Sequence, residues 1–316
     1  MIPTTMTFDV TILGSNSALP AHGRHPTSQV VNHNEKFYLL DCGEGTQMRL
    51  SDLKIKRSKI DQIFISHFHG DHYYGLIGLI TSYHLLQRQA PLHIFSPRGL
   101  KEIFDANFKY SQTHLVFDLQ FHEIDCNQSE VIYENDDISV KTILMNHRIP
   151  CTGFLFREKK HARKINAEKI QEYHVPISAI ADLKKGKDFI SGSEIIPNSE
   201  LTLDPSPERT YAFCSDTLFN EGIIPTIEGV DLLYHESTFM NESADRAAQT
   251  FHSTTLQAAT IAQKANVKKL IIGHFSAKYS DLNLMVEEAR TIFPNTELAL
   301  EGEKFEVGIT VLQHTV

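Results

Sequence analysis

The sequence predicts a mixed α/β protein in which short apolar strands alternate with helices. Strand-like runs end repeatedly at small or polar residues, and helical segments follow them. The composition, 41% hydrophobic and 22% charged, is that of a globular protein. No short-period repeat is present along the 316 residues. Together these observations predict the α/β class.

The expected elements follow one another in a regular order. Residues 8–13 alternate apolar and polar side chains and stop at the turn that begins with Gly14, so they predict a first strand. We expect further strands at 36–40, 62–66, 92–95, 138–145, 152–157, 210–214, 231–234 and 268–272. We expect helices through Met48 and Leu50, from about 75 to 87, after Pro97, and around 254–264 and 281–291.

Bulk properties exclude several classes of protein. No apolar run approaches the roughly 18 residues of a membrane span, and the first 23 residues lack the Lys or Arg that begins a secretory signal. The four cysteines are far apart and form no C-x-x-C pair, which favours reduced thiols in a cytoplasmic protein. The net charge of −9 argues against nonspecific nucleic-acid binding. We therefore expect neither a membrane nor a DNA partner.

One segment differs from the rest in its charge. Between residues 154 and 188, nine Lys and Arg residues stand against five acidic residues, a balance of +4 in a chain of −9. We expect a single catalytic domain over 1–316, with residues 154–190 inserted in it as a basic arm that projects from the core. A solvated charged surface is the alternative interpretation of this segment.

The strongest chemical signal is a motif of three histidines and one aspartate directly after an apolar strand. His67 and His69 are spaced by two and point to the same side of an extended chain. Gly70 permits a tight turn that brings Asp71 and His72 back toward them. Four metal-binding side chains therefore converge within six residues, in a chain with 17 histidines. This spacing predicts a metal site.

Three further candidates each end an apolar strand-like run: His147, Asp216 and His274. An aspartate after a strand is often a helix N-cap, and a single histidine is more often structural than a ligand. Each candidate is therefore weak when taken alone. Because all three repeat one placement, we expect them to complete the metal site.

The pattern His67-x-His69-x-Asp71-His72, with His147, Asp216 and His274, resembles the seven ligands of the metallo-β-lactamase superfamily. The fold of that superfamily is a four-layer αβ/βα sandwich with metals at the edge between its halves. Nearly the whole chain takes part in a narrower resemblance, to the ribonuclease Z family. The segments that carry it are 12–15, 40–47, 146–151, 235–239, 252–254 and 273–276.

The resemblance implies two zinc ions per subunit. One ion would take His67, His69 and His147, the other Asp71, His72 and His274, with Asp216 bridging them and Asp41 orienting a ligand. Two such ions share a hydroxide and lower the pKa of bound water from about 16 towards 7. Hydrolysis then needs no serine or cysteine nucleophile.

The resemblance also implies the groups that move protons. His252 would donate a proton to the leaving oxygen, and Glu236 would orient His252. Asp71 is an alternative proton acceptor as well as a ligand. A structural place beside the N-cap of the helix expected at 254–264 is the other interpretation of His252.

The implied activity is that of a zinc-dependent endoribonuclease that cleaves the 3′ trailer from tRNA precursors, leaving a 3′ hydroxyl on the tRNA and a 5′ phosphate on the trailer. The resemblance further implies a homodimer in which the arm of one subunit serves tRNA held at the other's site. Another dinuclear-zinc phosphodiesterase or exoribonuclease of the same fold is an alternative. A non-catalytic zinc-containing tRNA-binding protein is a second alternative, from a different class.

Overall fold

The computed structural model describes residues 7–308, which form two compact units. Of the described residues, the first unit contains 7–133, 140–156 and 209–308. The second unit contains Glu134–Ser139 and Arg157–Glu208. Among the described residues, no helix has the length and apolar character needed to cross a membrane.

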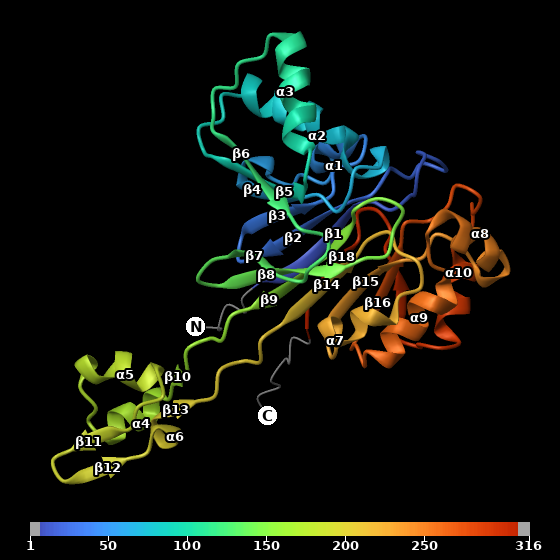
Figure 1. Ribbon diagram of the computed structural model, residues 1–316. Coiled ribbons are helices and arrows are strands. Elements are labelled where there is room, and N and C mark those ends of the chain that lie inside the picture. Colours follow the sequence, from blue (N-terminus) through green and yellow to red (C-terminus); the bar gives the residue numbers. More distant parts are fainter. Residues whose placement is uncertain (1–6, 309–316) are drawn as a thin grey trace. The chain divides into compact units, whose positions relative to one another are not determined.

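The first sheet has seven strands in the order β18-β1-β2-β3-β4-β5-β6 (Figure 1). Their bounds are β18 Lys304–Glu306, β1 Phe8–Gly14, β2 Ser28–His33, β3 Lys36–Leu40, β4 Ile60–Phe64, β5 Leu92–Pro97 and β6 Leu119–Ile124. The strands from β18 to β3 pair antiparallel, and those from β3 to β6 pair parallel. Its helices are α1 Thr46–Asp52, α2 Gly70–Leu85 and α3 Leu100–Ser111.

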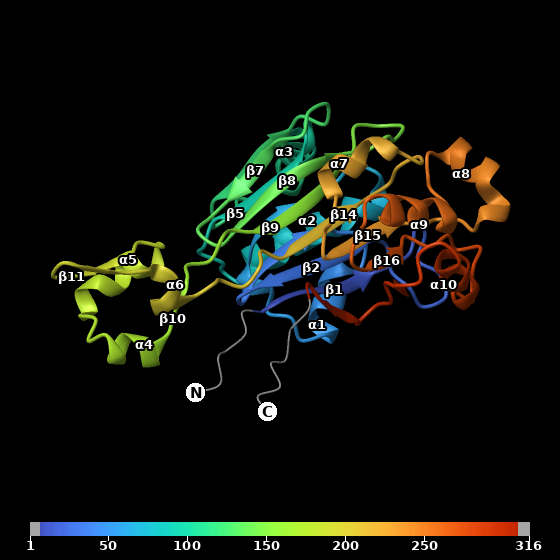
Figure 2. The same ribbon diagram turned by 90° about the horizontal axis from the view of Figure 1, so that it is seen from below.

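The second sheet also has seven strands, in the order β17-β16-β15-β14-β9-β8-β7 (Figure 2). Their bounds are β17 Thr296–Leu298, β16 Leu270–Gly273, β15 Leu232–Glu236, β14 Thr210–Cys214, β9 Thr152–Glu158, β8 Ile138–Leu144 and β7 Val131–Glu134. Its helices include α7 Ile224–Ile227, α8 Ala244–Thr250, α9 Thr255–Lys264 and α10 Asn283–Arg290. The strands from β14 to β17 pair parallel, as the alternation of strand and helix predicts.

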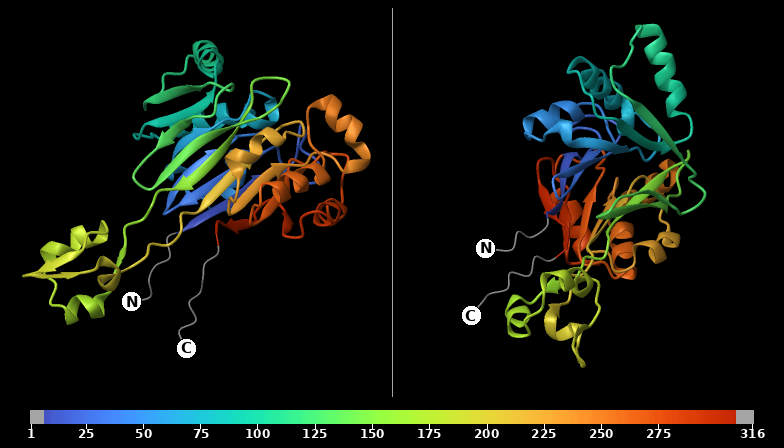
Figure 3. Two further views of the ribbon diagram at one scale, coloured as in Figure 1. Left: turned by 60° about the horizontal axis from the view of Figure 1, so that its bottom comes forward. Right: turned by 90° about the vertical axis from the view of Figure 1, so that its left-hand side faces the viewer.

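The two sheets face each other through aromatic side chains, and the helices cover their outer faces (Figure 3). In β4, Ile63 packs in the same apolar cluster as Leu79 of α2. The next residue, Phe64, contacts Phe154 and Phe156 of β9, with ring centroids 5.4 and 5.6 Å apart. Successive side chains of a strand point to opposite faces, so each sheet lies between helices and the other sheet. The expected four-layer αβ/βα sandwich is confirmed.

The expected start of one helix is wrong. The sequence placed a loop up to about residue 75, whereas α2 begins at Gly70 with His69 as its N-cap. Asp71 and His72 therefore lie in the first helical turn, where a carboxylate interacts favourably with the helix dipole. The sequence signal was ambiguous because Gly70 is typical of a turn.

The second unit has its own small core, formed by Val175, Leu183, Ile196 and Leu201. Its elements are β10 Lys164–Ile165, α4 Ala167–Glu172, α5 Ile180–Lys184, β11 Phe189–Ser191, β12 Glu194–Ile196, α6 Asn198–Leu201 and β13 Thr202–Leu203. β10 pairs with β13 and β11 with β12. The unit extends to residue 208, beyond the expected segment 154–190. Over 157–208 it holds nine basic and nine acidic residues, so the positive charge is local.

The larger segment of the second unit, Arg157–Glu208, connects two neighbouring strands of the second sheet, β9 and β14. β9 begins directly after Cys151, whose thiol donates to the carbonyl oxygen of Asp216 at 3.5 Å, and Asp216 lies just past the end of β14. β9 therefore starts where β14 ends, and the two strands run in opposite directions. The insertion joins them at their other ends.

Candidate metal centre

The predicted ligands all lie just beyond the carboxyl ends of strands in the first unit. They follow β4 (His67, His69, Asp71 and His72), β8 (His147), β14 (Asp216) and β16 (His274). Loops at the carboxyl ends of strands are where sites form in α/β folds. The structure brings all seven side chains together, from both sheets.

The first group of ligands consists of three histidines and one oxygen of Asp216. His67 Nε2 lies 3.0 Å from His69 Nδ1, which lies 3.1 Å from His147 Nε2. Asp216 Oδ2 lies 3.5 Å from His67 Nε2 and 3.9 Å from His147 Nε2. Tetrahedral ligands at about 2.0–2.1 Å from one ion are separated by roughly 3.3 Å. These distances fit four ligands around one divalent ion.

The second group contains Asp71, His72, His274 and the other oxygen of Asp216. His72 Nε2 and His274 Nε2 lie 3.2 Å apart. Asp71 Oδ2 lies 3.6 Å from His72 Nε2 and 3.4 Å from His274 Nε2. Asp216 Oδ1 lies 3.4 and 3.2 Å from the same two nitrogens. This group has the spacing of a second ligand set.

Asp216 divides its two carboxylate oxygens between the groups. Its side chain is buried, and within the described part of the chain Oδ1 has no hydrogen-bond partner. A buried carboxylate oxygen without a partner costs several kcal/mol unless a cation neutralises it. The surrounding donors are imidazole and carboxylate groups, which bind divalent metals. The residues present therefore fit a metal-binding site.

A close backbone contact between Gly43 and Gly75 fixes the position of the first turn of α2. Cys42 N donates to His72 O at 2.7 Å, and Gly75 N donates to Cys42 O at 2.9 Å. A Cβ added to Gly75 would lie 2.1 Å from Gly43 O, and one added to Gly43 would lie 2.4 Å from Asp71 O. Neither position accepts a side chain. The close approach fixes Asp71 and His72 relative to the end of β3.

The outward ring nitrogens of three of the histidines are held by neighbouring oxygens. Asp41 Oδ2 accepts from His72 Nδ1 at 2.7 Å, Phe251 O from His147 Nδ1 at 2.9 Å, and Thr238 Oγ1 from His274 Nδ1 at 2.9 Å. Such contacts fix which nitrogen of an imidazole faces a metal. Asp41 and His274 both have positive φ angles, 52° and 62°, a conformation that is uncommon for residues other than glycine.

The ionisable side chains of the cluster favour a bound cation. Burial acts to raise the pKa of Asp71 and Asp216, but His72 and His274 hold both pKa values below their usual range. Burial acts to lower the pKa of His72, yet the carboxylates of Asp216, Asp71 and Asp41 raise it well above its usual value. Three carboxylates around one imidazole create a strongly negative environment. A bound divalent ion would neutralise it.

His252 and Glu236, the other predicted site residues, lie beside the cluster. His252 Nδ1 donates to Glu236 Oε1 at 3.0 Å, and the His252 ring lies 5.3 Å from the ring of His274. Burial lowers the pKa of His252, but the carboxylates of Glu236 and Asp216 outweigh this effect and raise the pKa to about 9. His252 stands two residues before Thr254, the N-cap of α9, which forms a complete capping box with Gln257.

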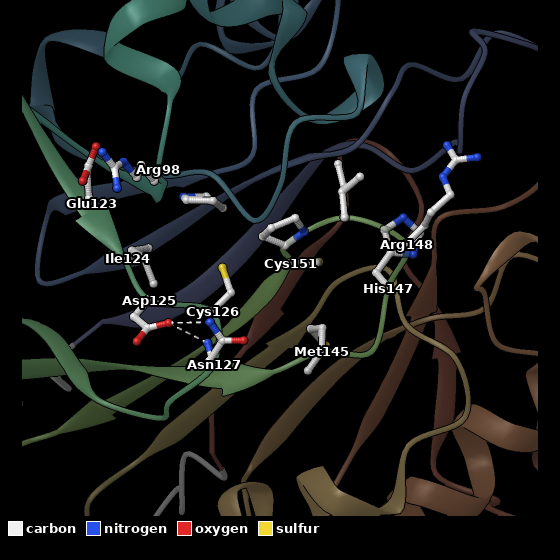
Figure 4. Close-up of a pocket in the computed structure, with 13 residues that line it drawn as sticks. Arg98, Glu123, Ile124, Asp125, Cys126, Asn127, Met145, His147, Arg148 and Cys151 are labelled. Carbon is white, nitrogen blue, oxygen red and sulfur yellow. Dashed lines mark hydrogen bonds between the residues drawn. The ribbon is translucent and has the colours of Figure 1, made fainter.

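A cavity beside the cluster was not anticipated from the sequence. It has a volume of about 660 Å³ and is lined by His147, Arg148 and Cys151, among others (Figure 4). Arg148 Nη2 lies 3.1 Å from His69 Nε2. The only sequence signal for Arg148 was its place directly after a predicted ligand.

Comparisons with known proteins agree with this geometry. Ribonuclease Z of Bacteroides fragilis is 46% identical over 296 residues, 93% of this chain and 97% of that protein. Ribonuclease Z of Cytophaga hutchinsonii is 45% identical over 304 residues, 96% of this chain and 97% of that protein. The sequence model of the family described as "Anti-Pycsar protein Apyc1" matches residues 8–292.

Solved structures give the fold. The crystal structure of the short form of human tRNase Z has 26% identity and a TM-score of 0.70, and the match covers 95% of this chain and all of that chain (100%). The metallo-β-lactamase fold protein YhfI of Bacillus subtilis has 17% identity and a TM-score of 0.69, with coverages of 96% and 100%.

The fold and the clustered histidines and aspartates define a metal-dependent hydrolase of the metallo-β-lactamase fold. The relatives named ribonuclease Z share more than 40% sequence identity with this chain over nearly its whole length, which narrows the class to one family. The chain belongs to the ribonuclease Z family, and also to the sequence family described by the Apyc1 model. It is therefore an endoribonuclease.

Proposed function

We propose that this chain removes the 3′ trailer from tRNA precursors in the cytoplasm, leaving a 3′ hydroxyl on the tRNA and a 5′ phosphate on the trailer. The names of the relatives, ribonuclease Z and tRNase Z, support this substrate. The observation that carries the proposal is the division of Asp216 between two ligand groups, with His252 and its hydrogen-bonded partner Glu236 beside them. That arrangement suits cleavage of a phosphodiester.

The proposed metals are two zinc ions per subunit. His67, His69 and His147 would hold one, Asp71, His72 and His274 the other, and Asp216 would bridge them. When bound, such ions lower the pKa of a water towards 7 and stabilise charge that develops on a phosphate oxygen. None of these ligands is cysteine, which distinguishes the set from most closed structural zinc sites.

The side chains around the metals would handle the protons. His252 gives its Nδ1 proton to the hydrogen bond with Glu236, so Nε2 is the nitrogen left to protonate the departing 3′ oxygen. A pKa of about 9 keeps the ring protonated at neutral pH. Asp71 stays anionic and accepts a hydrogen bond from Ala18 N at 2.7 Å, so it would act as ligand and proton acceptor, never as donor.

The second unit would serve as the arm that binds tRNA. Four of its cations already have acidic partners: Lys159 with Glu134, Arg163 with Asp204, Lys169 with Glu172 and Lys187 with Asp182. Within residues 7–308, Arg157, Lys160, Lys184 and Lys185 have no such partner. We propose that these residues contact RNA phosphates, in a homodimer whose arm serves the other subunit.

A defined 3′-extended tRNA precursor tests the proposal. Incubation with the zinc-loaded chain should yield one cut directly after the discriminator nucleotide, with a 3′ hydroxyl on the tRNA. A ladder of products shortened one nucleotide at a time would indicate an exoribonuclease instead. Hydrolysis of small diesters with the precursor left intact would indicate a small-molecule phosphodiesterase.

A further inference from the structure

The cavity beside His147 is large enough for a nucleotide and is walled by three segments of the first unit. These segments are the end of β5 at Pro97 and Arg98, the turn after β6, and the stretch from Met145 to Cys151 (Figure 4). Its volume of about 660 Å³ is within the range of about 300–1,000 Å³ for small-ligand pockets. The cavity therefore has room for one base and its sugar.

Two arginines at this cavity have no acidic partner among residues 7–308. Arg98 and Arg148 are both exposed. Of the two acids in the wall, Asp125 already accepts hydrogen bonds from the main-chain and side-chain nitrogens of Asn127, both at 2.9 Å. Guanidinium groups without an acidic partner are suited to phosphate, which they bind through two parallel hydrogen bonds.

Arg148 lies on the side of the ligand cluster that is away from the proton donor. Its Nη2 contacts His69 Nε2 at 3.1 Å. The ring of His147 is 4.9 Å from that of His69 and 5.5 Å from that of His252. The ring of His147 therefore contacts both the ring that Arg148 touches and the ring of the proton donor. The guanidinium and the proton donor therefore flank the site where the phosphate would be cleaved.

This arrangement gives a direction to the RNA. In the proposed reaction, which this inference takes as given, His252 protonates the 3′ oxygen that leaves. The scissile phosphate stays with the nucleotide on the other side of the cut. That nucleotide must lead away from His252, towards Arg148 and the cavity.

We infer that the cavity receives the first trailer nucleotide and that Arg148 binds the phosphate that follows this nucleotide. Pro97, Ile124 and Met145 supply apolar wall for the base. Arg98 and Asn127 supply hydrogen-bond donors to its edge. Arg148 is a specificity residue in this scheme, because it holds the RNA beyond the reacting atoms.

A salt-dependence experiment tests the role of Arg148. Arg148→Gln should lower kcat/KM for the precursor about tenfold and reduce the slope of log kcat/KM against log salt by about 1, the value of one phosphate contact. Arg148→Lys should restore the slope. The matched control is Arg57→Gln, which removes the same charge before β4, at the opposite end of that strand from the ligands. An unchanged slope in Arg148→Gln with full metal content would overturn the inference.

Cross-linking places the nucleotide directly. A precursor with 4-thiouridine as the first trailer nucleotide, and a non-hydrolysable methylene phosphonate at the cut, is irradiated with the zinc-loaded chain. Cross-links to peptides that contain residues 97–98 or 123–127 are expected. Cross-links elsewhere, with normal cleavage of the ordinary precursor, would overturn the inference and leave the proposed function intact. A wild-type chain that leaves the ordinary precursor uncut would overturn both.

Discussion

Glu236 accepts hydrogen bonds from the side chain of His252 at 3.0 Å and from the backbone of Ser253 at 2.8 Å. One fully buried carboxylate therefore fixes both the ring and the loop that carries it. Thr217 N and Thr238 N donate to the same carboxylate, at 3.2 and 3.0 Å. Glu236 therefore fixes the position and orientation of His252, the proposed proton donor.

Replacing His252 should slow the chemical step without loss of metal. His252→Ala removes the group that protonates the leaving oxygen, and general acid catalysis contributes about 10²–10⁴-fold. We expect kcat for the precursor to fall within that range while KM and bound zinc, measured by atomic absorption, stay within about twofold. Near-normal kcat with zinc bound would remove His252 from the mechanism. Loss of zinc would assign it to the ligands, since it lies within 4.8 Å of Asp216 and His274.

Neutralising Glu236 should shift the pH dependence of cleavage. After burial, which opposes it, Glu236 is the largest influence on His252 and raises its pKa. The donor must be protonated, so activity is lost as pH rises through that pKa. Glu236→Gln keeps the shape but removes the charge, and we expect the alkaline limb of the kcat profile to move to lower pH. A limb that stays in place would contradict the coupling.

Removing the metals should destabilise the first unit. The carboxylates of Asp71 and Asp216 then face each other's charge without a cation. An ion present at 1,000 times its Kd contributes about 4 kcal/mol to the folded state. We expect a chelator to lower Tm in calorimetry and added zinc to restore it. Equal Tm values with and without chelator would contradict a metal held at this cluster.

The four cysteines should differ in reactivity. Cys42, Cys151 and Cys214 are buried, whereas Cys126 is partly exposed. Burial raises the pKa of Cys126 to about 11, so its thiolate is scarce at neutral pH. We expect a thiol reagent to modify Cys126 alone, slowly and faster at higher pH, as mapped by mass spectrometry. Cys126→Ser should abolish the labelling of the folded chain.

The unpaired lysines of the second unit should matter more than the paired ones. Lys184→Gln with Lys185→Gln removes two cations without acidic partners, so the affinity for tRNA should fall and its salt slope should decrease by up to about 2. Lys187→Gln is the control, because Lys187 already pairs with Asp182 at 3.0 Å. Binding is measured by fluorescence anisotropy, and hydrolysis of a small diester should be unchanged. Equal effects of the two variants would contradict the distinction.

It was possible to predict from the sequence that the ligand side chains lie together, because the ends of the strands can be recognised in the sequence. His147, Asp216 and His274 each follow a run of apolar residues, and the parallel strands of a sheet end at one edge. The α/β class follows from the same alternation of strand and helix, whereas the four layers were implied by the resemblance to the metallo-β-lactamase superfamily. The division of Asp216 between two groups depends on side-chain rotamers, which spacing does not reveal.

Other features could not be predicted from the sequence, for physical reasons. The first turn of α2 was predicted to be a loop because Gly70 is a poor helix residue and is typical of a turn. The balance of +4 over residues 154–188 does not extend to the whole second unit, because acidic residues such as Asp204 lie beyond the basic run. The cavity at Arg148 depends on three segments that are distant in sequence.

The insertion between β9 and β14 leaves and re-enters the sheet at adjacent points. Because those strands are antiparallel, a short turn in place of the whole insertion would turn them into an ordinary hairpin, and the register of the strands that bear the ligands would not change. Mutations, insertions or deletions within residues 157–208 can therefore change the length or the charge of the insertion while the ligand-bearing loops keep their positions. The insertion and the metal-ligand loops can therefore change independently of each other.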